Sequence, residues 1–185
     1  MKVLISDKMD ARCVEILQEN PGVEVDVRTG LDEAGLIDII GEYDALIVRS
    51  GTQVTPPVLE AAHRLKVVGR AGAGVDNIDT SAATRGGVIV MNTPGGNSVS
   101  TAEHSFAMIM SLARNIPQGT ASLKDGRWKR SQLTGVELCG KTIGILGLGK
   151  VGSEVALRAN AFGMKVLAYD PVVSSEVAET FGAQL

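Results

Sequence analysis

Aromatic residues are scarce in this chain of 185 residues, where they make up 3% of the sequence. Single-stranded nucleic acids are commonly bound by stacking their bases on aromatic side chains, so this class of partner is disfavoured. The net charge of −3 at pH 7 also disfavours a large nucleic-acid surface. Residues 124–130 form the only local basic cluster, whose simplest interpretation is a solvated surface. The sequence therefore predicts no nucleic-acid partner.

Cysteines and long apolar runs are also scarce. The two cysteines, Cys13 and Cys139, do not have the spacing of a metal or redox motif, so we expect reduced structural thiols and no metal site. No apolar stretch is long enough to cross a bilayer, and the first residues do not have the pattern of a signal peptide. We therefore expect a cytoplasmic protein without a membrane partner.

Short apolar runs alternate with segments of helical periodicity through the first half of the chain. The predicted strands are residues 2–6, 23–28, 45–48, 65–70 and 88–91, and the predicted helices are 9–17, 31–40, 56–63 and 79–85. Thr55 is the expected cap of the third helix. Repeated βα units of this size predict a parallel sheet with helices on both faces. We therefore predict a flavodoxin-like domain over residues 1–94.

A cluster of turn-forming residues at 92–98 marks the predicted domain boundary. Asn97 or Ser98 could cap the next helix, which should run to Ala113 and be well buried. An irregular helical stretch follows to about Leu133, and a second α/β unit is expected from Lys141. The second predicted domain is residues 95–185, in which leading helices that could form a subunit contact precede this α/β unit.

Three glycines follow the predicted strand at residues 142–146. Gly147, Gly149 and Gly152 have the G-x-G-x-x-G spacing, and a predicted helix continues over residues 151–162. In this motif the first glycine permits a tight turn, the second lets a pyrophosphate approach the backbone, and the third lets the helix pack on the strand. The helix N-terminus supplies amides and a positive dipole end to the phosphates.

A second strand at residues 165–169 ends in Asp170, 18 residues after Gly152. A carboxylate at about this distance accepts hydrogen bonds from the ribose hydroxyls of a dinucleotide. It would repel a 2′-phosphate, and no arginine adjoins it, so the pattern favours NAD over NADP. The alternative is a purely structural tight turn, but the strand, glycines, helix, second strand and acid occur together in register. The sequence therefore predicts the first βαβ part of a Rossmann domain.

Several motifs together resemble the NAD-dependent D-2-hydroxyacid dehydrogenases. They are Arg49-Ser50 after a strand, residues 69–77 (GRAGAGVDN), Asn92-Thr93-Pro94, the glycine motif, and Tyr169-Asp170-Pro171. The resemblance covers essentially the whole chain, and within the family it is greatest to members that act on 3-phosphoglycerate. It implies oxidation of a 2-hydroxyl group: a histidine supported by a carboxylate takes the proton, the nicotinamide takes hydride, and an arginine holds the substrate carboxylate.

The resemblance also implies roles for individual residues. The substrate-binding residues would be Arg49, Ser50, Gly74 and Val75, together with Arg130 reaching the substrate phosphate in a partner subunit of a homodimer or tetramer. The cofactor-binding residues would be Gly147, Gly149, Lys150, Val151, Gly152 and Asp170. Ala73 lies where a threonine often touches the cofactor, so any contact there would come from its backbone.

The resemblance places the catalytic arginine, glutamate and histidine of the family beyond Leu185. His63 is expected to be exposed and His104 to be a core histidine, so neither is a predicted catalytic group. The chain alone is therefore expected to be inactive.

Several alternatives stay open. The family member could act on another 2-hydroxy acid such as glyoxylate or hydroxypyruvate. The chain could instead be a non-catalytic, NAD-sensing corepressor-like module, or a dimerisation fragment. Arg49 could be a plain surface residue, and Gly72 and Gly74 could be ordinary turn glycines.

Overall fold

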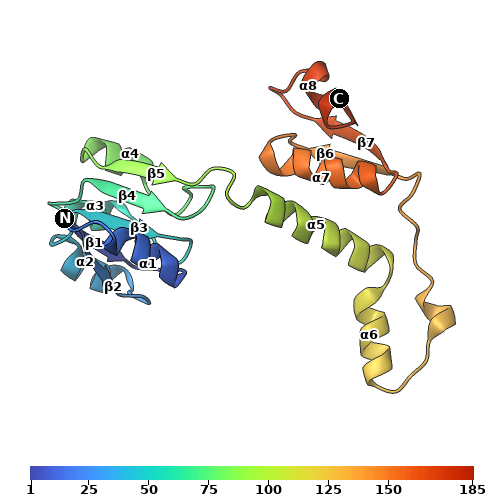
Figure 1. Cartoon of the computed structure of the whole chain (residues 1–185), viewed down its shortest axis with the longest axis horizontal. Helices are drawn as coiled ribbons and strands as arrows, with labels where there is room; N and C mark the ends of the chain where they lie inside the picture. The colour runs from blue at the N-terminus through green and yellow to red at the C-terminus, as the bar shows by residue number, and fades with distance from the viewer. The chain divides into compact units, whose positions relative to one another are not determined.

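The computed structural model describes residues 1–185 and divides into two compact units, Met1–Gly96 and Asn97–Leu185. Figure 1 colours unit 1 in blue to green and unit 2 from yellow-green to red. Each unit contains parallel strands joined by helices, which confirms the predicted α/β class. None of the helices has both the length and the hydrophobicity that a bilayer crossing requires.

Unit 1 contains a five-stranded parallel sheet in the order β2-β1-β3-β4-β5. The strands are β1 (Lys2–Ile5), β2 (Glu24–Val27), β3 (Ala45–Val48), β4 (Val67–Arg70) and β5 (Ile89–Asn92). This order is that of flavodoxin-like domains, in which ligands bind at the carboxyl ends of the strands. The predicted flavodoxin-like sheet is therefore confirmed.

Four helices connect these strands: α1 (Ala11–Gln18), α2 (Glu33–Ile40), α3 (Pro56–Ala61) and α4 (Thr80–Arg85). The main core of unit 1 contains Leu4, Leu46 and Val68 from the sheet, and α2, α3 and α4 all contribute to it. By contrast, α1 contributes no buried residue. Most of the apolar surface of unit 1 is thus buried beneath three helices.

The prediction that Thr55 caps α3 is wrong in one respect. Thr55 occupies the N-cap position but forms no capping hydrogen bond. Its hydroxyl instead donates to Glu33 Oε1 at 2.5 Å. The hydroxyl is thus directed towards a charged acceptor rather than towards the amides of the first turn of α3.

Unit 2 begins with two helices and a 3-10 turn, α5 (Ser98–Ala113), α6 (Ile116–Lys124) and η1 (Arg130–Leu133). They are followed by β6 (Thr142–Leu146), α7 (Lys150–Ala161), β7 (Lys165–Tyr169), α8 (Ser175–Thr180) and β8 (Ala183–Gln184), with the parallel strand order β6-β7-β8. The sequence analysis predicted no strand after β7. It missed β8 because a strand of two residues has no recognisable alternation.

Small residues allow α5 and α7 to pack closely in unit 2. Ala102, Ala156 and Ala159 have no exposed surface, and the Phe106 and Phe162 rings lie 4.8 Å apart between centroids. The prediction that α5 is well buried is nevertheless wrong, since only Ser98, Ala102 and Phe106 are buried on it. The residues of its other side are in contact with solvent, so its apolar composition did not report its burial.

One further expectation of burial is corrected by the structure. His104, expected in the core, is exposed on α5. Cys13 and Cys139, expected as structural thiols, are both free and exposed. His63 is exposed as expected. The apolar composition of α5 did not predict the burial of His104, because this residue lies on the exposed side of the helix.

Candidate functional site

The carboxyl edge of the sheet in unit 1 collects the residues predicted to bind substrate. The parallel register pairs Val48 with Arg70 and Arg70 with Asn92, so the segments that follow β3, β4 and β5 emerge side by side. A cavity of about 250 Å³ opens here. Its lining residues are Ile47, Gly69, Arg70, Ala71, Met91, Asn92 and Thr93. This edge is where parallel α/β sheets bind ligands.

Arg49 has a fixed backbone and an exposed side chain. Its amide donates to Asp7 Oδ2 at 2.6 Å, while its carbonyl accepts from Asn77 Nδ2 at 2.8 Å and from Arg70 Nε at 3.2 Å. The guanidinium donates to the Lys8 carbonyl at 3.4 Å, beyond the usual range of such bonds. Its remaining donors can therefore meet an anion, and the exposed Ser50 lies next to it in sequence.

The glycine-rich turn after β4 is built around the side chain of Arg70. This side chain is only 10% exposed, donates to the Gly74 carbonyl at 2.5 Å and pairs with Asp76 at 3.2 Å. A Cβ on Gly72 would lie 3.0 Å from Arg70 Nη1, and one on Gly74 would lie 2.9 Å from Asp76 Oδ1. Gly72 thus packs closely against the buried Arg70 side chain, whereas the exposed Asp76 side chain could move away from a Cβ on Gly74.

Ala73 and Val75 complete this turn through their backbones. The Ala73 carbonyl accepts from Asn92 Nδ2 at 2.6 Å, and the Val75 carbonyl accepts from the Ile78 amide at 3.0 Å. The turn thereby brings Ala73, Gly74 and Val75 to the same sheet edge as Arg49. Arg70 and Asn92 were not singled out from the sequence, although both belong to motifs that the resemblance used: Arg70 ends a predicted strand and Asn92 directly follows one.

Asp7 is a further residue that sequence reasoning missed. Its carboxylate accepts from the amides of Arg49 and Thr52 and, at 3.0 Å, from the Thr52 hydroxyl. Burial pushes its pKa upward, but these hydrogen bonds outweigh burial and hold the pKa below the ordinary value. An acid directly after the first strand was the available signal, because that position lies at the ligand-binding edge.

The three motif glycines of unit 2 have separate structural reasons. Gly147 has a φ of +94°, a conformation that other residues rarely adopt. A Cβ on Gly152 would lie 2.0 Å from the Gly147 carbonyl oxygen, whereas a Cβ on Gly149 would meet nothing within 4 Å. The space above Gly149 is thus open to a ligand, while the other two glycines shape the turn.

The first turn of α7 faces this open space. Gly149 is the N-cap of the helix and no side chain caps it, so the amide end and its positive dipole are available to an anion. Lys150 and Val151 are the first two residues of the helix. An uncapped helix N-terminus beside open space has the chemistry to bind an anion, and the pyrophosphate contact at these residues stays a prediction.

Asp170 lies beside the same loop, at the end of β7. Its Oδ2 accepts from the Leu148 amide at 2.8 Å, and its Oδ1 accepts from the amides of Val172 and Val173 at 2.9 and 3.0 Å. The amides of Val172, Val173 and Leu148, in this order of influence, lower the pKa of Asp170. An ionised carboxylate has about four acceptor sites, so it can still accept bonds from ribose hydroxyls. Val172, which is 89% exposed, offers an apolar surface nearby that sequence reasoning missed.

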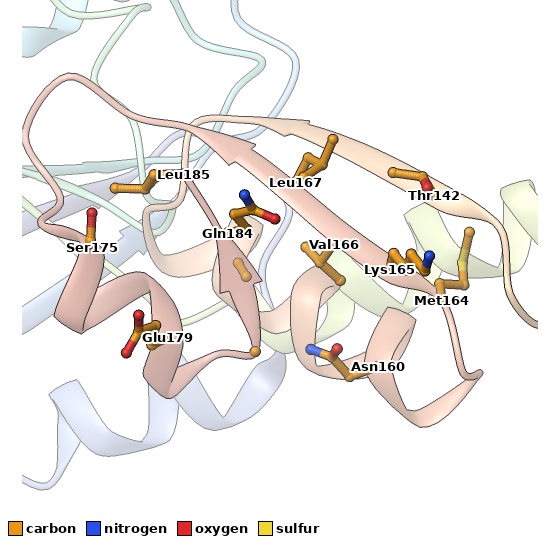
Figure 2. Close-up of a pocket in the computed structure, with 12 residues that line it drawn as sticks. Thr142, Asn160, Met164, Lys165, Val166, Leu167, Ser175, Glu179, Gln184 and Leu185 are labelled. Atoms are coloured by element: carbon orange, nitrogen blue, oxygen red, sulfur yellow. The ribbon is translucent and has the colours of Figure 1, made fainter.

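A larger cavity of about 630 Å³ lies elsewhere in unit 2 (Figure 2). Thr142 and Lys165 line it from the amino ends of β6 and β7, and Gln184 and Leu185 line it from β8 and beyond. None of the predicted cofactor-binding residues lines this cavity. Because dinucleotides bind at carboxyl ends of parallel strands, its size does not make it the cofactor site.

Arg130 occupies a different place in unit 2. It begins η1 and lines a cavity of about 290 Å³ together with Trp128 and Lys129. Its side chain is exposed, as is that of Trp128. The predicted contact of Arg130 with substrate would involve a second copy of the chain.

Both edges thus present charged side chains or free backbone amides where parallel α/β sheets bind ligands. The family model for the D-isomer specific 2-hydroxyacid dehydrogenase catalytic domain matches residues 3–184. This chain belongs to that family. The predicted family is therefore confirmed, together with the oxidoreductase class that it represents.

A similar relative is the D-3-phosphoglycerate dehydrogenase of Rattus norvegicus, which is 56% identical over 183 residues. The match covers 99% of this chain and 34% of the rat protein. The chain thus spans about a third of the length of the curated relatives that it matches. This partial coverage agrees with the prediction of an N-terminal part of a longer dehydrogenase.

Solved structures show the same fold. The NAD⁺-bound 3-phosphoglycerate dehydrogenase of Entamoeba histolytica is 31% identical with a TM-score of 0.79, covering 99% of this chain and 56% of that one. The D-lactate dehydrogenase of Aquifex aeolicus, complexed with NAD and lactic acid, is 27% identical with a TM-score of 0.84. That match covers 99% of this chain and 55% of the other. Members of the family therefore use NAD.

Proposed function

We propose that this chain is the part of a D-3-phosphoglycerate dehydrogenase that binds the substrate and the adenosine-pyrophosphate half of NAD. The observation that carries the proposal is the 56% identity to the rat enzyme along almost the whole chain. The reaction would convert 3-phosphoglycerate to 3-phosphohydroxypyruvate, a step towards serine. NAD, when bound, would accept hydride from C2 of the substrate.

In this proposal residues 1–94 form the substrate-binding domain. The Arg49 guanidinium and the Ser50 hydroxyl hold an anionic group of the substrate, and the backbone of Gly74 and Val75 borders it. The exposed side chains of Arg49 and Ser50 at the carboxyl edge support this assignment. Arg130, contributed by a second copy of the chain, would meet the phosphate.

Residues 95–185 would bind the cofactor. The backbone at Gly149, Lys150 and Val151 would contact the pyrophosphate, and Asp170 would accept bonds from the ribose hydroxyls. The open space above Gly149 and the uncapped start of α7 support these contacts. Ala73 would contribute through its backbone. Gly147 and Gly152 would act by shaping the loop.

The chain alone should not turn over substrate under this proposal. His63 and His104 are both exposed, and neither belongs to the glycine loop or the carboxyl edge described above. A general base must lie within hydrogen-bonding reach of the proton that it removes. The proton acceptor would therefore come from the part of the relatives that this chain does not span.

We also propose that the protein forms a homodimer or tetramer in the cytoplasm. Met108, Leu112, Leu123 and Trp128 on and near α5 and α6 are 58–78% exposed, which is unusual for a monomer surface. The free cysteines agree with a reducing compartment. Sedimentation across a concentration series should show association, and a stable monomer at every concentration would contradict this.

The cofactor arm of the proposal is tested by calorimetric titration of the purified chain with NAD and with NADP. NAD should bind more tightly, and Asp170→Asn should reduce the difference because the carboxylate that repels a 2′-phosphate is removed. Equal affinity for both dinucleotides in the unmodified chain would contradict the role of Asp170.

The substrate arm is tested by titrating the same chain with 3-phosphoglycerate, glyoxylate and hydroxypyruvate. The phosphorylated acid should bind most tightly, and Arg49→Ala should remove most of that affinity. A preference for an unphosphorylated acid would instead indicate another 2-hydroxyacid dehydrogenase. Binding of NADH without any of these acids would favour a non-catalytic, NAD-sensing module.

A further inference from the structure

We infer that Asp7 and Asn77 are positioning residues for Arg49. They fix the peptide groups on either side of this residue, so that its guanidinium binds an anion while its backbone is held in place. The inference rests on the proposed function, which makes Arg49 an anion-binding residue. It concerns two side chains that need not touch the substrate themselves.

Asp7 accepts a hydrogen bond from the amide of Arg49 and also binds Thr52, further along the loop. One carboxylate oxygen accepts the Arg49 amide at 2.6 Å, and the other accepts the Thr52 hydroxyl at 3.0 Å. The Thr52 amide also donates to this carboxylate, at 3.1 Å to the nearer oxygen. A Cβ on Gly51 would lie 2.6 Å from Asp7 Oδ1, so the loop closes tightly over the carboxylate.

Asn77 holds the C-terminal side. Its Nδ2 donates to the Arg49 carbonyl at 2.8 Å and to the Thr52 carbonyl at 2.6 Å. Its backbone carbonyl accepts a hydrogen bond from the Val54 amide at 2.8 Å, so the backbone and the side chain of Asn77 both bind the same loop. The segment from Arg49 to Val54 is thus held at three carbonyl or amide groups by one residue.

The orientation of the Asn77 side-chain amide leaves its oxygen without a hydrogen bond. Asn77 is 5% exposed, and its Oδ1 is buried without a hydrogen-bond partner. Rotating the amide by half a turn would place that oxygen against two carbonyl oxygens, which repel it. Buried polar atoms without partners are uncommon in folded proteins, so their retention calls for a reason. At Asn77 the reason is that Nδ2 donates to the carbonyl groups of Arg49 and Thr52.

The guanidinium of Arg49 is held less tightly than its backbone. The guanidinium donates at 3.4 Å to the Lys8 carbonyl, while both flanking peptide groups are bonded at 2.6–2.8 Å. A charged group on a fixed backbone loses less freedom when it binds, which favours affinity. Arg70 also donates to the Arg49 carbonyl, so removal of Asn77 would weaken the clamp without leaving that carbonyl unbonded.

The test uses Asn77→Asp in the 185-residue chain. An ionised carboxylate would face the carbonyls of Arg49 and Thr52 and donate nothing, whereas its protonated form could restore one bond. Several charged groups surround this position. Arg70 shares the Arg49 carbonyl with Asn77, and Asp7 binds the amide of Thr52. Asp76 and Asp79 lie on the same loop as Asn77. The negative neighbours and burial should keep the new carboxyl protonated in mildly acidic solution.

Affinity for 3-phosphoglycerate is measured by NMR titration at pH 8 and pH 5.5, always as a ratio to the unmodified chain at the same pH. At pH 8 the variant should bind about tenfold to a hundredfold more weakly, with increased motion of the amides of residues 49–52. At pH 5.5 most of the loss should disappear. A residue with a merely structural role would not give this recovery.

Asn160→Asp is the matched control, because Asn160 Nδ2 also donates to two backbone carbonyls, those of Ala156 and Phe181 in unit 2. It should leave the affinity ratio unchanged at both pH values. Asp7→Asn provides a second test should Asn77→Asp not fold. It should weaken binding at both pH values without acid recovery, since one of its two acceptor oxygens is lost.

The outcomes separate this inference from the proposed function. Rigid amides at 49–52 and unchanged affinity in the tested variants would overturn the positioning roles. If the unmodified chain does not bind 3-phosphoglycerate, the proposed function fails, and loop order alone then decides whether Asp7 and Asn77 hold the loop.

Discussion

The two units follow the same βα pattern but cover their sheets differently. In the central strands of unit 1, Leu4 and Leu46 on one face have no exposed surface, and Val3 and Ile5 on the other face are 1% exposed. Only towards the edge strand β5 does that second face open, where Ile89 and Met91 are 63% and 60% exposed. In unit 2 one face carries Ile145 and Val166, which are buried. The other face carries Leu146, Leu167 and Tyr169, which are 88%, 47% and 67% exposed.

This difference shows what a parallel sheet requires. Parallel strands are usually covered on both faces, and their residues are therefore apolar on both sides. The strands of unit 2 have this composition, but only one of their faces is covered within residues 97–185. The uncovered face of unit 2 is thus a surface suited to contact, whereas unit 1 covers its central strands on both faces and leaves apolar residues exposed on its edge strands.

The strongest test of this comparison is a pair of Leu→Ala substitutions, Leu46→Ala in β3 and Leu146→Ala in β6. The first removes a side chain with no exposed surface and should lower the free energy of unfolding of unit 1 by about 2–5 kcal/mol. The second should change that of unit 2 by less than about 0.5 kcal/mol. Hydrogen exchange in urea, resolved by unit, measures both. A large loss for Leu146→Ala would show that its face is covered in solution.

A second pair of substitutions separates folding from binding within the glycine loop. Gly152→Ala places a methyl group 2.0 Å from the Gly147 carbonyl oxygen and should destabilise unit 2 by about 1–3 kcal/mol. Gly149→Ala meets no protein atom within 4 Å, and the φ of −74° suits alanine.

Gly149→Ala should therefore leave the unfolding free energy of unit 2 unchanged while it weakens NAD binding. Denaturation and calorimetric titration of each variant provide the two measurements. Normal NAD affinity in Gly149→Ala would contradict the close approach of a pyrophosphate at this residue.

Acid should weaken both units through one carboxylate in each. The pKa of Asp7 in unit 1 and that of Asp170 in unit 2 are both lowered in the folded state. Their contribution to stability is complete above the unfolded pKa of about 3.9 and is lost as the pH falls through the lower folded pKa. Asp7→Asn should flatten this acid dependence in unit 1 only, and Asp170→Asn in unit 2 only. Unfolding curves between pH 2 and 6, resolved by unit, measure this dependence. The assignment would be wrong if each substitution changed the acid dependence of both units equally.

The smallest expected effect concerns Tyr43 in the core of unit 1. Burial, followed by its hydrogen bond to Asp26 at 2.6 Å, raises the pKa of Tyr43 to about 12. Because the folded state favours the protonated phenol, this stabilisation is present below the unfolded pKa of about 10 and is lost as the pH rises towards 12.

Ultraviolet titration of a Tyr169→Phe variant isolates Tyr43, since the chain has two tyrosines. Asp26→Asn in the same background is the matched change, and it should lower the pKa of Tyr43. An unchanged midpoint would show that burial alone accounts for the shift.

Much of the fold follows from local patterns. The five strands of unit 1, with the helices between them, were predicted because apolar runs and helical periodicity alternate clearly there. The roles of Gly147 and Gly152 were also accessible, since a tight strand-helix turn imposes the same backbone demands wherever it occurs. By contrast, β8 was missed because two residues carry no periodic signal.

The sequence by itself determined the α/β class, the glycine loop with its terminal acid, and a resemblance strong enough to indicate a family. These depend on neighbouring residues and on short-range backbone geometry. Only the tertiary structure decided that α5 and His104 are exposed, that Arg70 fills the glycine-rich turn, and that Asp7 and Asn77 grip Arg49 from both sides. Residues 7, 49 and 77 are far apart in sequence, and they meet because the carboxyl ends of parallel strands share one edge of the sheet.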